Sequence, residues 1–115
     1  MISIVRTPIL VNNKAVIDIG EWQTCSIQVI GLTGTMSLLG TNDAGDITGS
    51  TNGGPGDATN FTAVQATNLT TGVAATAVTG TNMFRIDPIG FKYLQIGDGA
   101  TATATKILVF CTKPY

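Results

Sequence analysis

The sequence WQTCSIQVIGLTGTMSLLGTN, residues 22–42, decides the fold class of this chain. Apolar and polar side chains alternate along its first half, and they alternate again in its second half as far as Leu38. Alternation with a period of two is typical of a β-strand with one buried face. Glycines at both ends of residues 31–34 adopt positive φ angles without steric cost, which favours a tight turn. The stretch therefore predicts a β-hairpin, and a hairpin needs a second layer to cover it.

The rest of the chain repeats this pattern of short strands and turns. The further candidate strands are residues 2–5, 9–11, 15–19, 61–66, 73–78, 83–87, 91–96 and 101–111. Clusters of Gly, Asn and Pro separate them at intervals of about ten residues, and no stretch has helical periodicity. We therefore predict an all-β fold, an antiparallel two-sheet β-sandwich that is jelly-roll-like.

A chain of 115 residues is long enough for one domain with a real core. We predict a single domain over residues 1–115, with an N-terminal arm at about 1–8 and a long surface loop at about 41–60. The loop is rich in Gly, Asn, Asp, Ser and Thr, so it has little to bury. The arm and the loop are the segments that we expect to be free to reach a neighbouring molecule.

Composition excludes several classes of function. Charged residues make up only 11% of the chain and the net charge is −1, so the sequence lacks the basic footprint of a nucleic-acid or membrane-surface protein. Histidine is absent, which removes the commonest general base and the commonest transition-metal ligand. No apolar run approaches the ~20 residues that span a bilayer, and the first residues do not form a signal peptide. We predict a chain made in a cytosol, with no enzyme activity and no cofactor.

Two cysteines, Cys25 and Cys111, lie inside strand-like runs. We expect free buried thiols, because cytosolic thiols stay reduced. A disulfide between the two strands is the alternative.

The acidic residues of the long loop are Asp43, Asp46 and Asp57. Oxygen ligands on a loop can hold calcium, but the EF-hand spacing and its bidentate glutamate are missing. Ordinary turn chemistry, in which Asp side chains brace their own backbone, is the better interpretation. The Asn60 and Asn68 tripeptides match the glycosylation pattern, and we interpret both as chance matches in a chain rich in Asn and Thr.

Aromatic residues offer a second candidate site. Trp22, Phe61 and Tyr93, with Phe84 and Phe91, could form a sugar-stacking platform. Most of them occupy alternating positions that favour the core.

The last strand is apolar on both faces. Ile107, Val109 and Cys111 lie on one face, while Leu108 and Phe110 lie on the other. Such a strand is either central with a cover on both sides or part of a subunit contact.

The order of several short motifs carries a family resemblance. They are Trp22-Gln23-Thr24, Leu32-Thr33-Gly34-Thr35, Gly40-Thr41-Asn42-Asp43, Leu69-Thr70-Thr71-Gly72, Met83-Phe84-Arg85-Ile86-Asp87 and Gly90-Phe91-Lys92-Tyr93. Together with the final alternating strand, they resemble a β-sandwich domain of tailed-phage virion proteins. The resemblance covers roughly residues 20–110.

This resemblance implies a capsid decoration (cement) protein, which binds the major capsid protein and stabilises the shell. It also implies a homo-oligomer, often a trimer, on the capsid surface of the virion. A receptor- or carbohydrate-binding module of a phage fibre or tail is the alternative. The candidate interaction residues are Ile2, Ile4 and Arg6 of the arm and Asp43, Asp46 and Asp57 of the loop.

Overall fold

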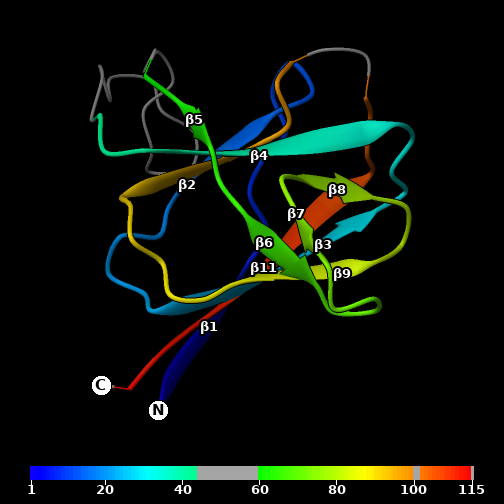
Figure 1. The fold of residues 1–115 in the computed structure, drawn as a ribbon. Coiled ribbons are helices and arrows are strands. Elements are labelled where there is room, and N and C mark those ends of the chain that lie inside the picture. The colour runs from blue at the N-terminus through cyan, green and yellow to red at the C-terminus, as the bar shows by residue number, and fades with distance from the viewer. Residues whose placement is uncertain (44–59, 100–101, 115) are drawn as a thin grey trace.

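Two antiparallel β-sheets packed face to face make up the fold (Figure 1). The structure is a computed structural model that describes residues 1–43, 60–99 and 102–114. These residues contain strands and turns but no helix. The prediction of an all-β, antiparallel two-sheet sandwich is therefore confirmed.

Each sheet is assembled from strands that are distant in the sequence. The first sheet has the order β1 (Ile2–Arg6), β11 (Lys106–Lys113), β3 (Thr24–Ile30), β9 (Met83–Ile86), β6 (Ala66–Asn68) and β7 (Ala74–Ala75). The second has the order β2 (Ala15–Asp18), β10 (Tyr93–Ile96), β4 (Thr35–Thr41) and β5 (Thr62–Ala63), and β8 (Ala77–Thr79) also pairs with β4.

The stretch at residues 22–42 does not form a hairpin, so that prediction is wrong. β3 pairs with β11 and β9 in the first sheet, whereas β4 pairs with β10 in the second, and the chain crosses between the layers (Figure 1). The connection bonds elsewhere, because the Thr33 amide donates to the Thr103 carbonyl at 2.8 Å and the Thr33 carbonyl accepts from the Thr103 amide at 3.0 Å. Gly31 and Gly34 do have positive φ angles, 69° and 89°. The alternation correctly placed a buried face on each strand but did not identify the partner.

The inner faces of the two sheets form the core. Cys25, Ile27 and Val29 of β3 are buried and so are Met36 and Leu38 of β4. The other fully buried large side chains are Ile17, Ile19, Val78, Phe84, Leu94, Ile96, Ile107 and Val109. Removing these apolar surfaces from water is the main driving force for packing the sheets together.

The first residues form an edge strand, so the prediction of a free N-terminal arm is wrong. β1 pairs with β11, with Ile2 opposite Lys113 and Ile4 opposite Cys111. Backbone hydrogen bonds to β11 fix a segment that would otherwise fray, because termini stay disordered unless something holds them. The two ends of the chain consequently lie side by side (Figure 1).

Two of the shorter predicted strands, at residues 9–11 and 73–78, differ from the strands observed. Residues 9–11 do not form a strand; only an isolated bridge joins Val11 to Lys14, around a turn where Asn12 and Asn13 have φ angles of 54° and 61°. The weak strand at 73–78 divides into β7 and β8, which belong to different sheets. A segment that passes from one sheet to the other cannot keep the same alternation of buried and exposed side chains. Most side chains in residues 73–78 are small, so the sequence gives little sign of where the alternation changes.

We predict that Gly40→Ala lowers the free energy of unfolding by about 1–3 kcal/mol, because overpacking forces neighbouring side chains to move. A Cβ at Gly40 would stand 2.8 Å from both Val64 Cγ1 and Phe91 Cδ2. Gly90→Ala is the matched control, since a Cβ there would meet nothing within 4 Å. Urea unfolding curves measure both variants. Equal midpoints for the two would contradict the packing at Gly40.

Candidate interaction surface

The described residues do not assemble a metal-binding cluster. Within residues 1–43, 60–99 and 102–114, no three His, Cys, Asp or Glu side chains lie together so that they could hold a metal ion. The same residues include no helix with the length and apolar character needed to cross a membrane. The candidates for function are therefore surfaces and pockets.

The two cysteines face each other across neighbouring strands. Cys25 of β3 is the register partner of Cys111 of β11, and both thiols are free and buried. The predicted free buried thiols are confirmed, and the alternative disulfide does not form. Burial, together with the nearby Cys111 thiol, raises the pKa of Cys25 to about 12, and burial raises the pKa of Cys111 to about 11. Both groups are consequently protonated thiols and weak nucleophiles at neutral pH.

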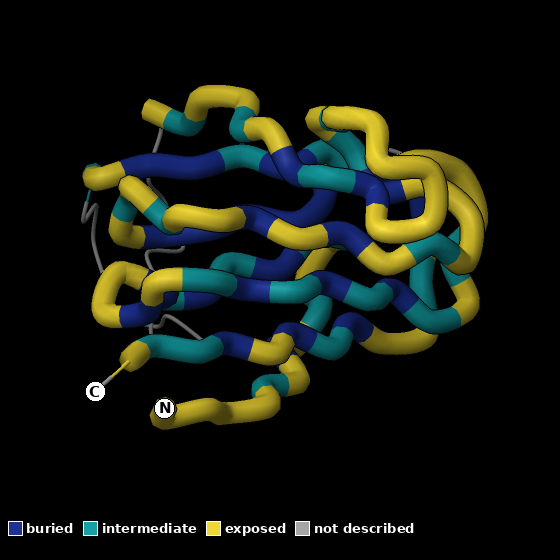
Figure 2. The backbone as a smooth tube through the Cα atoms, turned by 60° about the horizontal axis from the view of Figure 1, so that its bottom comes forward, coloured by how far each residue is buried: buried dark blue, intermediate teal, exposed yellow. Residues whose placement is uncertain are grey.

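The candidate residues of the N-terminal segment separate into two kinds. Ile2 and Ile4 are exposed on β1, whose first four residues all lie at the surface (Figure 2). Arg6 is partly buried instead, and its Nη1 donates a hydrogen bond to the Asp18 carbonyl at 3.1 Å. Asp18 lies at the end of β2, so Arg6 joins the two sheets. Of these three candidate residues, Ile2 and Ile4 are therefore the ones exposed enough to contact another molecule.

The candidate residues of the loop are only partly within the structure. Asp43 accepts a hydrogen bond from Asn60 Nδ2 at 3.1 Å on Oδ2, and its amide donates to Thr41 Oγ1 at 2.9 Å. The Thr41 hydroxyl thus accepts the backbone bond of this turn, whereas the Asp43 carboxylate bonds to the Asn60 side chain. Asp46 and Asp57, and most of the predicted loop at 41–60, lie outside the described residues.

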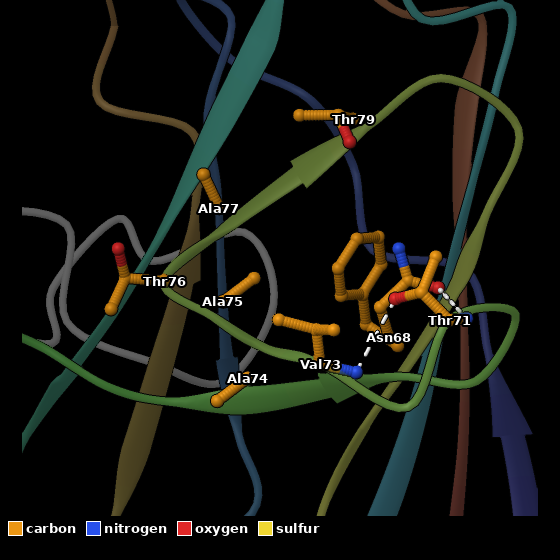
Figure 3. Close-up of a pocket in the computed structure, with 9 residues that line it drawn as sticks. Asn68, Thr71, Val73, Ala74, Ala75, Thr76, Ala77 and Thr79 are labelled. Carbon is orange, nitrogen blue, oxygen red and sulfur yellow. Dashed lines mark hydrogen bonds between the residues drawn. The ribbon is translucent and has the colours of Figure 1, made fainter.

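A pocket of about 270 Å³ lies beside β7 and β8 (Figure 3). Alanine and threonine side chains line most of it, together with Asn68, Val73 and Phe84. Two of its polar side chains bond to the backbone: Asn68 Oδ1 accepts from the Thr71 amide at 3.3 Å, and Thr71 Oγ1 accepts from the Val73 amide at 3.3 Å (Figure 3). These bonds hold the turn between β6 and β7. We interpret Asn68, which is buried, as a structural residue, in agreement with its glycosylation tripeptide being a chance match.

The aromatic residues do not form the sugar-stacking platform. Trp22 and Tyr93 are buried and Phe61 is half-buried. Trp22 also has Lys113 Nζ 4.9 Å from its ring centroid, so a cation already occupies a position over the indole. Stacking of a sugar requires an open aromatic face, and three of the five proposed residues, Trp22, Tyr93 and Phe84, lack one.

An apolar groove lies on the outside of the first sheet. It has a volume of about 320 Å³ and is lined by Val5, Ser26, Gln28, Met83, Leu108 and Phe110. Val5 is 64% exposed and Phe110 is 42% exposed, which are high values for large apolar side chains. β11 lies between β1 and β3 in its sheet. Its inner face is covered by the second sheet, and no described strand covers its outer face. Contiguous exposed apolar side chains of this kind mark interaction surfaces.

Two of the four apolar residues of this groove were predictable from the sequence. Leu108 and Phe110 stood out because their strand is apolar on both faces. Val5 and Met83 were missed as surface residues, although the alternation of each strand places its side chain on the outer face of the sheet. Only the register of β1, β11, β3 and β9 shows that these side chains meet.

Comparison with known proteins identifies a shared fold. No protein-family model matches the chain, and no curated protein sequence matches it. Among solved structures, the SPBc2 prophage-derived protein YomS is similar, with a TM-score of 0.67 and 13% sequence identity. The similarity covers 95% of this chain and 91% of that one. At this identity the match shows that the two chains have the same fold.

We predict a characteristic alkaline behaviour for the buried thiols. The folded state holds the Cys25 proton up to a pKa of about 12, whereas an ordinary thiol loses it near 9. The stabilisation from the protonated thiol is therefore complete below pH 9 and is lost as the pH rises towards 12. Unfolding free energies measured from pH 7 to 11 should fall more steeply for the wild type than for Cys25→Ala. Parallel curves would contradict this pKa difference.

Proposed function

We propose that this chain is a phage structural protein that decorates the capsid by binding the major capsid protein and stabilising the shell. The fold that it shares with a prophage-derived protein supports a phage origin. The order of its sequence motifs, which resembles that of virion sandwich domains, supports the same class. This role requires contact surfaces and no catalytic group or cofactor.

The observation that carries the proposal is the edge strand β1. Its outer edge has no strand partner among the described residues, so its backbone groups are available. Ile2 and Ile4 are exposed on one face of β1 and Val5 on the other. Natural proteins usually protect such edges with Lys, Pro or a bulge, and β1 has none of these. An extended segment of a capsid subunit can therefore add to β1 as a further strand.

Symmetric assembly makes weak contacts of this kind effective. A homo-oligomer presents the same edge several times to a lattice that repeats its own binding site, so small contacts combine into high avidity. The resemblance implies a trimer. The proposed location is the capsid surface of the virion, after synthesis in the host cytosol, and two reduced thiols are consistent with that compartment.

The alternative, a receptor- or carbohydrate-binding module of a fibre or tail, has less support. It depended on exposed aromatic side chains, and Trp22 and Tyr93 are buried. We therefore prefer decoration of the capsid.

The first test is direct decoration. Capsids of the phage that encodes this chain, assembled without it, are incubated with the purified protein and imaged by electron cryomicroscopy. We expect density at symmetry-related positions on the outer shell and a higher temperature of shell disruption. Bare capsids at saturating protein would overturn the proposal.

A second test asks whether β1 makes the contact. We predict that Ile2→Lys/Ile4→Lys weakens capsid binding at least about tenfold, because charges on an edge strand oppose pairing with another strand. Leu69→Lys is the matched control, since Leu69 is 45% exposed and Ile2 is 46% exposed, but Leu69 lies in the turn between β6 and β7. Co-sedimentation with capsids measures all three proteins. Equal binding by the β1 variant and the control would exclude β1 as the contact.

A further inference from the structure

The outer face of the first sheet has an apolar centre whose residues come from four neighbouring strands. Register places Val5, Phe110, Ser26 and Arg85 in one row across β1, β11, β3 and β9. Leu108, Gln28 and Met83 form the next row, on the same side of the sheet. The shorter side chain of Ser26 between Phe110 and Arg85 leaves the hollow that appears as the groove. The centre of this face therefore offers apolar surface with a hydroxyl and an amide for hydrogen bonds.

Two charged groups of the face, Lys106 and Asp87, lie at opposite corners of its central part, and the exposed Arg85 lies in a row between them. β9 and β11 both pair antiparallel with β3, so they run in the same direction. Lys106 begins β11, and Asp87 directly follows the end of β9, with the parity of Arg85. Lys106 and Asp87 therefore lie at opposite ends of the face and on opposite sides of β3. Both are exposed, and neither forms an ion pair with another described residue.

We propose that this outer face binds a second copy of the chain, face to face, across a two-fold axis that lies in the plane of the contact. Such an axis exchanges the two charged corners, so Lys106 of each copy faces Asp87 of the other. A surface whose positive and negative groups are placed in this way is complementary to itself, which is what an isologous interface requires.

The same axis also aligns the apolar residues. The axis is the line in the plane of the face from which Lys106 and Asp87 are equally distant. With strands ~4.8 Å apart and alternate residues ~6.8 Å apart, this line passes within about 1 Å of the positions of Val5, Phe110 and Met83. These side chains consequently meet their own copies along the axis, where the contact is driest. Aromatic and apolar anchors at the centre with charges at the rim are the usual arrangement of a stable interface.

The area of the face fits a pair of chains. The six strands of the first sheet hold 29 residues, and each residue covers ~4.8 Å by ~3.4 Å of the face. The projected area is roughly 470 Å², and corrugation by side chains brings the accessible area near the ~600 Å² per partner at the lower limit of standard interfaces, as expected of dimers that dissociate on dilution. Two sheet faces also pack well together at a separation of ~10 Å.

Analytical ultracentrifugation of the free protein, without capsids, tests the proposal independently of the role in decoration. We predict dimers that dissociate on dilution, and we predict that Phe110→Glu shifts the protein to monomers at the same concentration, because it buries a charge at the axis. Val73→Glu is the control, since Val73 is exposed in the turn before β7. Circular dichroism shows whether each variant keeps its fold.

A charge exchange tests the geometry of the pair. Lys106→Glu should weaken dimerisation at least about tenfold by opposing two acidic groups at each corner, and Lys106→Glu/Asp87→Lys should restore it. A monomer at every concentration, a trimer indifferent to these variants, or a double variant as weak as the single one would each overturn the proposal. A monomeric wild type whose capsid binding is lost in Phe110→Glu would overturn it too and would assign the face to the capsid.

Discussion

The pairing of β11 with β1 on one side and β3 on the other is the contact on which the rest of the structure depends. It fixes the N-terminal segment as an edge strand and places Cys111 opposite Cys25. It also turns Ile107 and Val109 into the core and leaves Leu108 and Phe110 outside. One strand with two apolar faces thus supplies three buried side chains of the core, Ile107, Val109 and Cys111, and two residues of the outer groove, Leu108 and Phe110. The sandwich core and the groove consequently share one strand.

The low charge of the chain has different consequences inside and outside the sandwich. Inside, few charges means few desolvation penalties, and the described core is built from aliphatic side chains, Phe84, Trp22 and two thiols. Outside, a charge-poor surface gives little repulsion between copies and little penalty for covering a sheet face. The few charges that do form pairs, such as Lys92 with Asp18 at 3.0 Å, lie at the periphery of the sheets. A protein of this composition is suited to lasting contacts with other proteins.

Periodicity in the sequence predicted which face of each strand is buried, and it could not predict which strand lies beside it. Alternation from Thr24 to Leu38 is the same for a hairpin and for two strands in opposite layers, because side-chain burial repeats every two residues in both. The same limit explains why Ile2–Arg6 was expected to be free. The hydrogen bonds that hold it come from β11, more than a hundred residues away in the sequence. The burial of the two thiols was predictable from the alternation of their strands, whereas the groove, including Val5 and Met83, depended on register.

The edge of β1 and the outer face of its sheet can be occupied at the same time. A strand added to β1 continues the sheet in its own plane, whereas a partner on Phe110 and Met83 lies above that plane. Val5 is the one apolar residue that belongs to both surfaces, because it projects from the edge strand into the groove. A partner strand beside Val5 would extend the apolar face and enlarge the area available to a second copy. The two proposed contacts would therefore favour each other, which is the coupling expected of a subunit that binds a lattice more tightly when its neighbours are already in place.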